Sequence, residues 1–133
     1  LVSFWLMASA RVSATEGERW QVREHYVLYP NPYPKAKQVK KRWHGHPVFP
    51  KLVDLDAGSL VLRSSWRTYL DEFAAAICHA HANALSAGSH PTLARYHAGA
   101  LAGARERSIE AAVPSMTNFE EKYRVSGQPT YEL

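Results

Sequence analysis

The chain has 133 residues with 46% hydrophobic side chains, which is typical of one globular domain and excludes an intrinsically disordered protein. Its net charge of +4 favours an anionic partner, and its single cysteine excludes an intramolecular disulfide and indicates a reducing compartment, so we expect a cytoplasmic protein. No apolar run approaches the roughly 20 residues of a membrane-spanning helix, so the sequence predicts no membrane segment.

The first predicted element is a short amphipathic helix over residues 1–10, in which Leu1, Phe4, Trp5 and Ala8 lie at helical spacing. Because no basic segment precedes these apolar residues, they are interpreted as a helix rather than a signal peptide. The chain does not begin with Met, from which we expect it to be a piece of a longer protein.

Strands and helices alternate in the next predicted elements. Short aromatic and β-branched runs bounded by proline or glycine predict the strands, and apolar residues every three or four positions predict the helices. We expect the long helix to be capped by Ser64 or Ser65, whose side-chain oxygens can accept a backbone hydrogen bond. The expected order is strand 24–30, loop 31–42, helix 47–55, strand 59–64 and helix 66–84.

The last third of the chain is less regular. Residues 92–113 are rich in alanine and predict a helix, although Gly99 and Gly103 weaken the pattern. A final segment opens at Asn118 and leads into a short strand over residues 130–133. The alternation of strands and helices along the chain predicts an open α/β sheet.

Two polar stretches follow the carboxyl ends of predicted strands, where open α/β sheets bind their ligands: Asn31 follows the first, and Ser64–Ser65 the second. The prolines on both sides of Asn31 restrict the backbone, so its amide can direct one acceptor and one donor at the edge of a flat heterocycle. Tyr33 offers a ring for stacking. The alternative is a plain proline turn in which Asn31 bonds to its own backbone.

A basic run follows this turn, and Trp43 and His44 come directly after it. Such a run can hold phosphate groups, and the neighbouring rings can stack on a nucleobase or a sugar. The alternative is a solvated surface without a partner. The cationic residues are Lys35, Lys37, Lys40, Lys41 and Arg42.

His44 and His46 could together chelate a metal ion, which would indicate a metal-dependent hydrolase. No third ligand lies nearby in the sequence, and His79 and His81 point to different faces of the predicted helix. We therefore expect no metal site, and we expect Cys78 to be a small buried residue.

Four segments together resemble the tRNA guanine-N7 methyltransferase family. In that family a strand ends in Asp-Pro-Trp-Pro-Lys, a stretch rich in His, Lys and Arg follows, and a Thr-x-[Phe/Tyr]-Glu motif comes near the end. The resemblance covers about residues 22–85 and 115–133, whereas residues 88–113 match nothing in the family pattern. The four segments are YPNPYPK at 29–35, KKRWHGHPVFPKL at 40–52, GSLVLRSSW at 58–66 and TNFEEKY at 117–123.

The resemblance implies an S-adenosylmethionine-dependent methyltransferase on a doubly wound, Rossmann-like α/β sheet, which transfers a methyl group to a purine nitrogen of tRNA. It also implies that residues 1–133 are a single partial domain, the C-terminal portion of that fold. The Gly-rich turn that holds most of the S-adenosylmethionine in such enzymes has no counterpart in this sequence.

Each matching residue takes an expected role from the resemblance. Asn31 and Glu120 are expected to be catalytic residues that hold the purine edge, and Asn31 and Pro32 are expected to border the cofactor. The residues expected to bind the tRNA substrate are Tyr33, Lys35, Lys40, Lys41, Arg42, Trp43, His44, Ser64, Ser65 and Thr117.

The sequence departs from the family pattern at three places. Asn31 replaces an Asp, Tyr33 replaces a Trp, and Ser64–Ser65 replaces Thr-Asp. The loss of two carboxylates supports a second hypothesis, in which the chain is a catalytically degenerate remnant that binds RNA without chemistry. Because an Asn-Pro-x-Tyr motif also occurs in methyltransferases that act on exocyclic or amide nitrogens, the acceptor atom stays open.

Overall fold

The computed structural model describes residues 23–53, 58–88, 91–107 and 117–133. The helix expected over residues 1–10 lies outside this part of the chain. Among the described helices, none has the length and apolar character needed to cross a bilayer. The elements are β1 (Glu24–Leu28), η1 (Ala36–Lys41), η2 (Trp43–Gly45), α2 (Phe49–Val53), β2 (Ser59–Ser64), α3 (Arg67–Ala87), α4 (Pro91–Ala102), β3 (Arg105–Arg107), α5 (Asn118–Ser126) and β4 (Thr130–Glu132), where η denotes a 3-10 helix.

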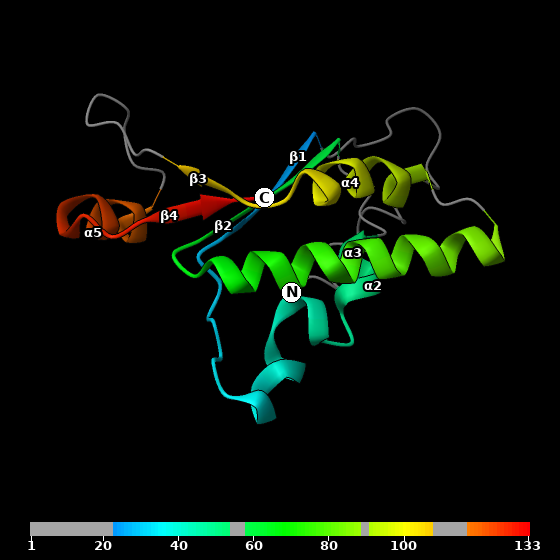
Figure 1. Ribbon diagram of the computed structural model, residues 1–133, viewed down its shortest axis with the longest axis horizontal. Coiled ribbons are helices and arrows are strands. Elements are labelled where there is room, and N and C mark those ends of the chain that lie inside the picture. The colour runs from blue at the N-terminus through cyan, green and yellow to red at the C-terminus, as the bar shows by residue number, and fades with distance from the viewer. Residues whose placement is uncertain (1–22, 54–57, 89–90, 108–116) are drawn as a thin grey trace, which may run out of the picture.

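The strands form a four-stranded mixed sheet in the order β1-β2-β4-β3 (Figure 1). β1 and β2 are parallel, with Glu24 opposite Ser59 and Leu28 opposite Arg63. β4 is antiparallel to both β2 and β3. The α/β class predicted from the sequence is therefore confirmed, and the doubly wound, Rossmann-like sheet stays a prediction.

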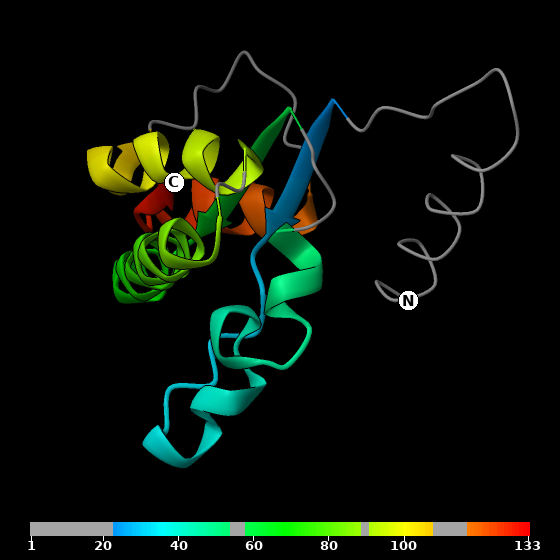
Figure 2. The same cartoon turned by 90° about the vertical axis from the view of Figure 1, so that its right-hand side faces the viewer.

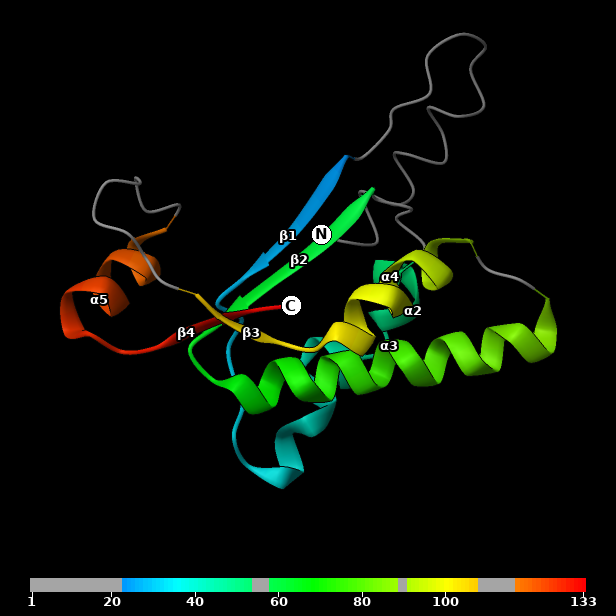
Figure 3. The ribbon, with the colours of Figure 1, turned by 45° about the horizontal axis from the view of Figure 1, so that its top comes forward.

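The connection from β1 to β2 carries the short helices. Parallel neighbours require such a crossover, because the chain must return to the amino end of the sheet. In Figure 2 this segment, drawn in cyan, projects from the sheet with η1 and η2 before α2 leads back toward β2. Because β1 and β2 are parallel, they end at the same edge, and Figure 3 shows both pointing toward the end of the sheet where α3 begins and α5 lies.

The core lies between the sheet and the helices α3 and α4. Leu62 of β2 and the α3 residues Tyr69, Leu70 and Phe73 are at most 1% exposed. Each such side chain contributes about 1.5–3 kcal/mol by leaving water. The apolar periodicity that predicted the long helix is therefore confirmed, and its aromatic residues Tyr69 and Phe73 are core residues.

Three local predictions are wrong. The basic stretch expected as loop forms 3-10 turns instead. The expected helix over 92–113 ends at Ala102, because Gly103 takes the left-handed conformation (φ +74°), and residues 105–107 form β3; residues 108–113 lie outside the described part. The N-cap of α3 is Trp66, whose N–H donates to Ser64 Oγ at 3.0 Å, so neither expected serine holds the cap position.

Candidate functional site

The chain leaves β1 through a strained turn. Tyr29 and Tyr33 have φ of +47° and +44°, and they are the only non-glycine residues in the described segments with positive φ. This region is uncommon for a bulky side chain, and such strain persists where the surroundings hold it, often at ligand sites. The two tyrosines enclose Pro30, Asn31 and Pro32, which the sequence singled out.

Contacts from distant elements hold the first strained tyrosine. The Tyr29 ring lies against two rings of α5, with centroid distances of 6.2 Å to Phe119 and 5.3 Å to Tyr123. The Tyr29 hydroxyl donates to Glu120 at 3.3 Å. Burial, with the nearby Glu120 carboxylate as the second cause, raises the pKa of Tyr29 to about 12.

A buried arginine, Arg42, holds the second strained tyrosine, Tyr33. Arg42 is 3% exposed, and its Nε and Nη2 donate to the Tyr33 carbonyl at 3.2 and 3.0 Å. Its Nη1 pairs with Glu72, and its guanidinium lies 5.1 Å from the Trp66 ring centroid. Arg42 was expected to hold phosphate, but the structure turns it inward, where it braces the turn against α3.

The strained turn, the end of β2 and α5 together enclose a cavity of about 270 Å³, which we call the strand-end cavity. The structure therefore brings Asn31, Pro32, Ser64 and Ser65 together, although the sequence separates the two pairs by 32 positions. Of the described side chains that line it, none carries a formal charge. They are Tyr29, Pro30, Asn31, Pro32, Ser64, Ser65, Trp66, Phe119 and Tyr123.

The polar groups in the strand-end cavity are neutral donors and acceptors. Asn31 is exposed, and its Oδ1 accepts from the Tyr33 N–H at 3.4 Å, as the proline-turn alternative expects. Its amide NH₂ makes no hydrogen bond to another described residue. Ser64 Oγ accepts from a backbone N–H, which leaves its own proton to donate. This set suits a flat, uncharged, polar ligand such as a heterocycle edge.

Glu120 lies behind the aromatic wall of this cavity, and it is 2% exposed. Its Oε1 accepts from Arg63 Nη1 and Arg107 Nη1, both at 2.9 Å, as well as from Tyr29. Asn31 and Glu120 thus lie at the same end of the sheet, where Tyr29 lines the cavity together with Asn31 and bonds to Glu120. If Glu120 bound a purine edge, as the resemblance implies, its Oε1 would have to accept hydrogen bonds from the base. That oxygen already accepts hydrogen bonds from donors of the protein itself.

A second carboxylate, Glu132, contacts the same two arginines. Glu132 Oε2 accepts from Arg63 Nε at 2.7 Å and Arg107 Nε at 3.2 Å. These contacts between two arginines and two glutamates join β2, β3, β4 and α5 behind the strand-end cavity. Thr117 also has a structural position, because its Oγ1 accepts the Glu120 N–H at 3.2 Å as the N-cap of α5.

His44, expected on the RNA-binding surface, is also turned inward. Its side chain is 7% exposed, its Nε2 lies 3.2 Å from Glu72 Oε2, and its ring meets Tyr69 and Phe73 edge-on. Burial lowers the pKa of His44. The inward position comes from a carboxylate on α3, 28 positions away in the sequence, so local spacing could not reveal it.

The lysines of the basic run remain at the surface, exposed to solvent. One of them borders a second cavity of about 300 Å³, which we call the loop cavity. Its lysine, Lys41, places Nζ 5.8 Å from the Tyr33 ring centroid. The residues lining the loop cavity are Asn31, Tyr33, Lys41, Trp43, His46 and Val48.

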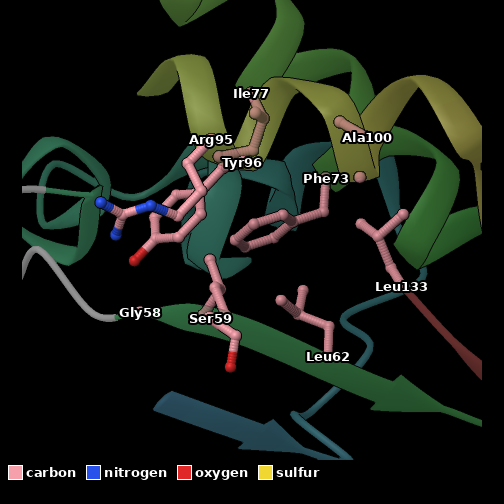
Figure 4. Close-up of a pocket in the computed structure, with 11 residues that line it drawn as sticks. Gly58, Ser59, Leu62, Phe73, Ile77, Arg95, Tyr96, Ala100 and Leu133 are labelled. Atoms are coloured by element: carbon pink, nitrogen blue, oxygen red, sulfur yellow. The ribbon is translucent and has the colours of Figure 1, made fainter. Parts of the chain in front are cut away.

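A third cavity of about 230 Å³ lies between β2 and the helices α3 and α4. Figure 4 shows Leu62, Phe73 and Leu133 turned toward its interior, with the Arg95 guanidinium away from these side chains. This cavity offers mainly hydrocarbon and no group of reactive side chains.

The described residues hold no group of three or more His, Cys, Asp or Glu side chains that could bind a metal ion.

Sequence reasoning missed Phe119, Tyr123, Arg107 and Glu132. The two aromatic residues lie four positions apart on α5, which places them on one helix face, and that spacing could have indicated a shared wall. The charged pair comes from short strands whose partners are far apart in the sequence.

Comparison of the chain with protein-family models, with curated proteins and with solved structures found no match.

Proposed function

We propose that the chain is the substrate-binding portion of an S-adenosylmethionine-dependent methyltransferase that acts on a purine nitrogen of tRNA. The observation that carries the proposal is the strand-end cavity. It lies beyond the carboxyl ends of two parallel strands, where open α/β sheets bind ligands. Its strained rim presents Asn31 between prolines, in the motif that resembles the methyltransferase family.

The neutral lining of this cavity suits methyl transfer to a ring nitrogen. Guanine N7 has a lone pair and no proton, so its methylation requires no general base. The sulfonium of S-adenosylmethionine supplies an activated methyl group, and Asn31 and Pro32 would border that group. The residues mainly align the acceptor nitrogen, and such alignment contributes a large rate factor.

The Asn31 amide and the Ser64 hydroxyl would hold the base edge, and Phe119 and Tyr123 would cover its face. Pairing polar groups with a base edge discriminates strongly, since a wrong base leaves those groups unsatisfied. The exposed residues Lys35, Lys40 and Lys41 would hold phosphates without reading sequence.

The decisive experiment measures methyl transfer. The full-length protein that contains this chain is incubated with tRNA and S-adenosylmethionine labelled in its methyl group, and the methylated nucleoside is identified by mass spectrometry. We expect a methylpurine, and a loss of about 100-fold or more in rate for Asn31→Ala, the size seen when one positioned polar group is removed. Asn83→Ala, on the exposed surface of α3, is the matched control. A folded wild-type protein that binds the cofactor but methylates no RNA would refute the proposal.

A second candidate is a module that binds RNA without chemistry. The neutral residues at Asn31 and Ser64–Ser65, where the family has carboxylates, favour it. Salt-dependent affinity for tRNA with no measurable affinity for S-adenosylmethionine would support this candidate over the enzyme.

A further inference from the structure

The two cavities near the strained turn are neighbours that share one wall residue. Asn31 lines both the strand-end cavity and the loop cavity, and Tyr33 lies on the loop side. A ligand whose base is held by Asn31 in the first cavity therefore has a second recess directly beside it.

The loop cavity presents two aromatic side chains on a held backbone. Two hydrogen bonds from Arg42 fix the Tyr33 carbonyl. The backbone N–H of Trp43 donates to the Tyr69 hydroxyl at 3.0 Å, which joins this turn to the core of α3. Because the backbone that carries these two rings is held in place, less conformational freedom is lost when a ring stacks on a base.

The polar groups of the loop cavity suit a phosphodiester. Lys41 supplies a positive charge beside the Tyr33 ring. His46 Nδ1 accepts from the Val48 N–H at 3.1 Å, so in the neutral imidazole the proton lies on Nε2, which can donate to an anion. Among the described residues, no carboxylate lines the loop cavity.

We propose that the loop cavity binds the nucleotide adjacent to the acceptor nucleotide, with its base against Tyr33 and its phosphate near Lys41. A ring face beside a cation is the usual combination in sites for single-stranded RNA. This inference rests on the proposed RNA substrate and specifies it: the protein recognises at least two consecutive unpaired nucleotides, and a free nucleoside or mononucleotide is a poor ligand.

The test measures RNA binding and therefore does not depend on methyl transfer. The probe is fluorescein-labelled UUUGUU, together with variants that carry an abasic ribose at one position next to the G, and binding is read by fluorescence anisotropy. With wild-type protein we expect one flanking abasic site to weaken binding about fivefold or more, the loss of one stacked base. Tyr33→Leu should weaken binding of the intact probe similarly and abolish the further effect of the abasic site.

Three further variants test the assignment of the base and of the phosphate to the loop cavity. Tyr123→Leu changes the strand-end cavity, so it should keep the sensitivity to the flanking abasic site. Lys41→Ala should reduce the salt dependence of binding by about one phosphate contact. Lys37→Ala, also exposed on η1 but outside the loop cavity, should have the smaller effect on both affinity and salt dependence.

Several results would overturn the inference: no binding of the probe, equal affinity for GMP and the hexanucleotide, an unchanged abasic effect in Tyr33→Leu, or displacement by polyglutamate as efficient as by RNA. If binding behaves as expected and no methyl transfer occurs, the proposed chemistry fails and the second nucleotide pocket stands. If methyl transfer occurs but flanking bases have no effect on binding, the second nucleotide pocket fails and the proposed chemistry stands.

Discussion

Glu120→Gln tests whether the buried charge network holds α5 in place. The substitution keeps the shape of the side chain and removes its charge, so Arg63 and Arg107 lose their ionic contacts to Glu120 and keep those to Glu132. The Glu120 side chain is 3% exposed, whereas that of Glu132 is 37% exposed. The same two arginines thus contact one buried and one half-exposed carboxylate.

The expected size of the effect follows from this difference in burial. Removing one partner from a buried ion pair destabilises a protein by about 3–5 kcal/mol, because the remaining charge loses its compensation. Since Glu132 still contacts both arginines, we expect a loss at the lower end of this range. An exposed pair contributes about 0–1 kcal/mol. Since a typical domain is stable by about 5–15 kcal/mol, Glu120→Gln should remove a large part of the stability, and Glu132→Gln, the matched control, only a small part.

Urea unfolding followed by tryptophan fluorescence and far-UV circular dichroism measures both variants against the wild type. The reasoning would be refuted if the two variants lost equal stability, or if Glu120→Gln lost less than about 1 kcal/mol, the value for an exposed pair. If Glu120→Gln is too unstable to purify while Glu132→Gln folds normally, the predicted order holds.

Two further predictions concern the cap of α5 and the buried histidine. Thr117→Ala should lower stability by about 1 kcal/mol, because the Glu120 N–H loses its acceptor, while Thr117→Ser should keep it; equal thermal melts for the alanine variant and the wild type would contradict this. Because burial lowers the pKa of His44 in the folded state, the unfolded state binds the proton more readily. Stability should therefore fall as the pH drops below about 6.5, the pKa of the unfolded group, and His44→Gln should lose less stability than the wild type over the same interval, measured by urea unfolding at several pH values.

The secondary structure around the candidate site was predictable because local patterns determine it. Apolar runs bounded by proline and glycine marked β1 and β2, and the periodicity from residue 66 marked α3. The meeting of Asn31 with Ser64 and Ser65 also followed, because parallel strands end at the same edge.

The inward-facing charges were not predictable. Arg42 and His44 look like members of a basic surface run, and their burial depends on Glu72, which belongs to a helix 28 or more positions later. Glu120 matched a family motif, but its partners Arg63 and Arg107 come from separate strands. β3 has only three residues, all charged, so no apolar alternation marked it.

The brace formed by Arg42 makes the rim of the strand-end cavity depend on a helix that does not line it. Glu72 orients Arg42, Arg42 holds the Tyr33 carbonyl, and Tyr33 closes the turn that carries Asn31. Substitutions on α3 at Glu72 would therefore resemble site mutations in their effect on ligands while leaving every contacting side chain intact. Evolution could therefore change ligand binding in this cavity through the length or charge of the side chain at position 72, while the Asn31 turn keeps its sequence.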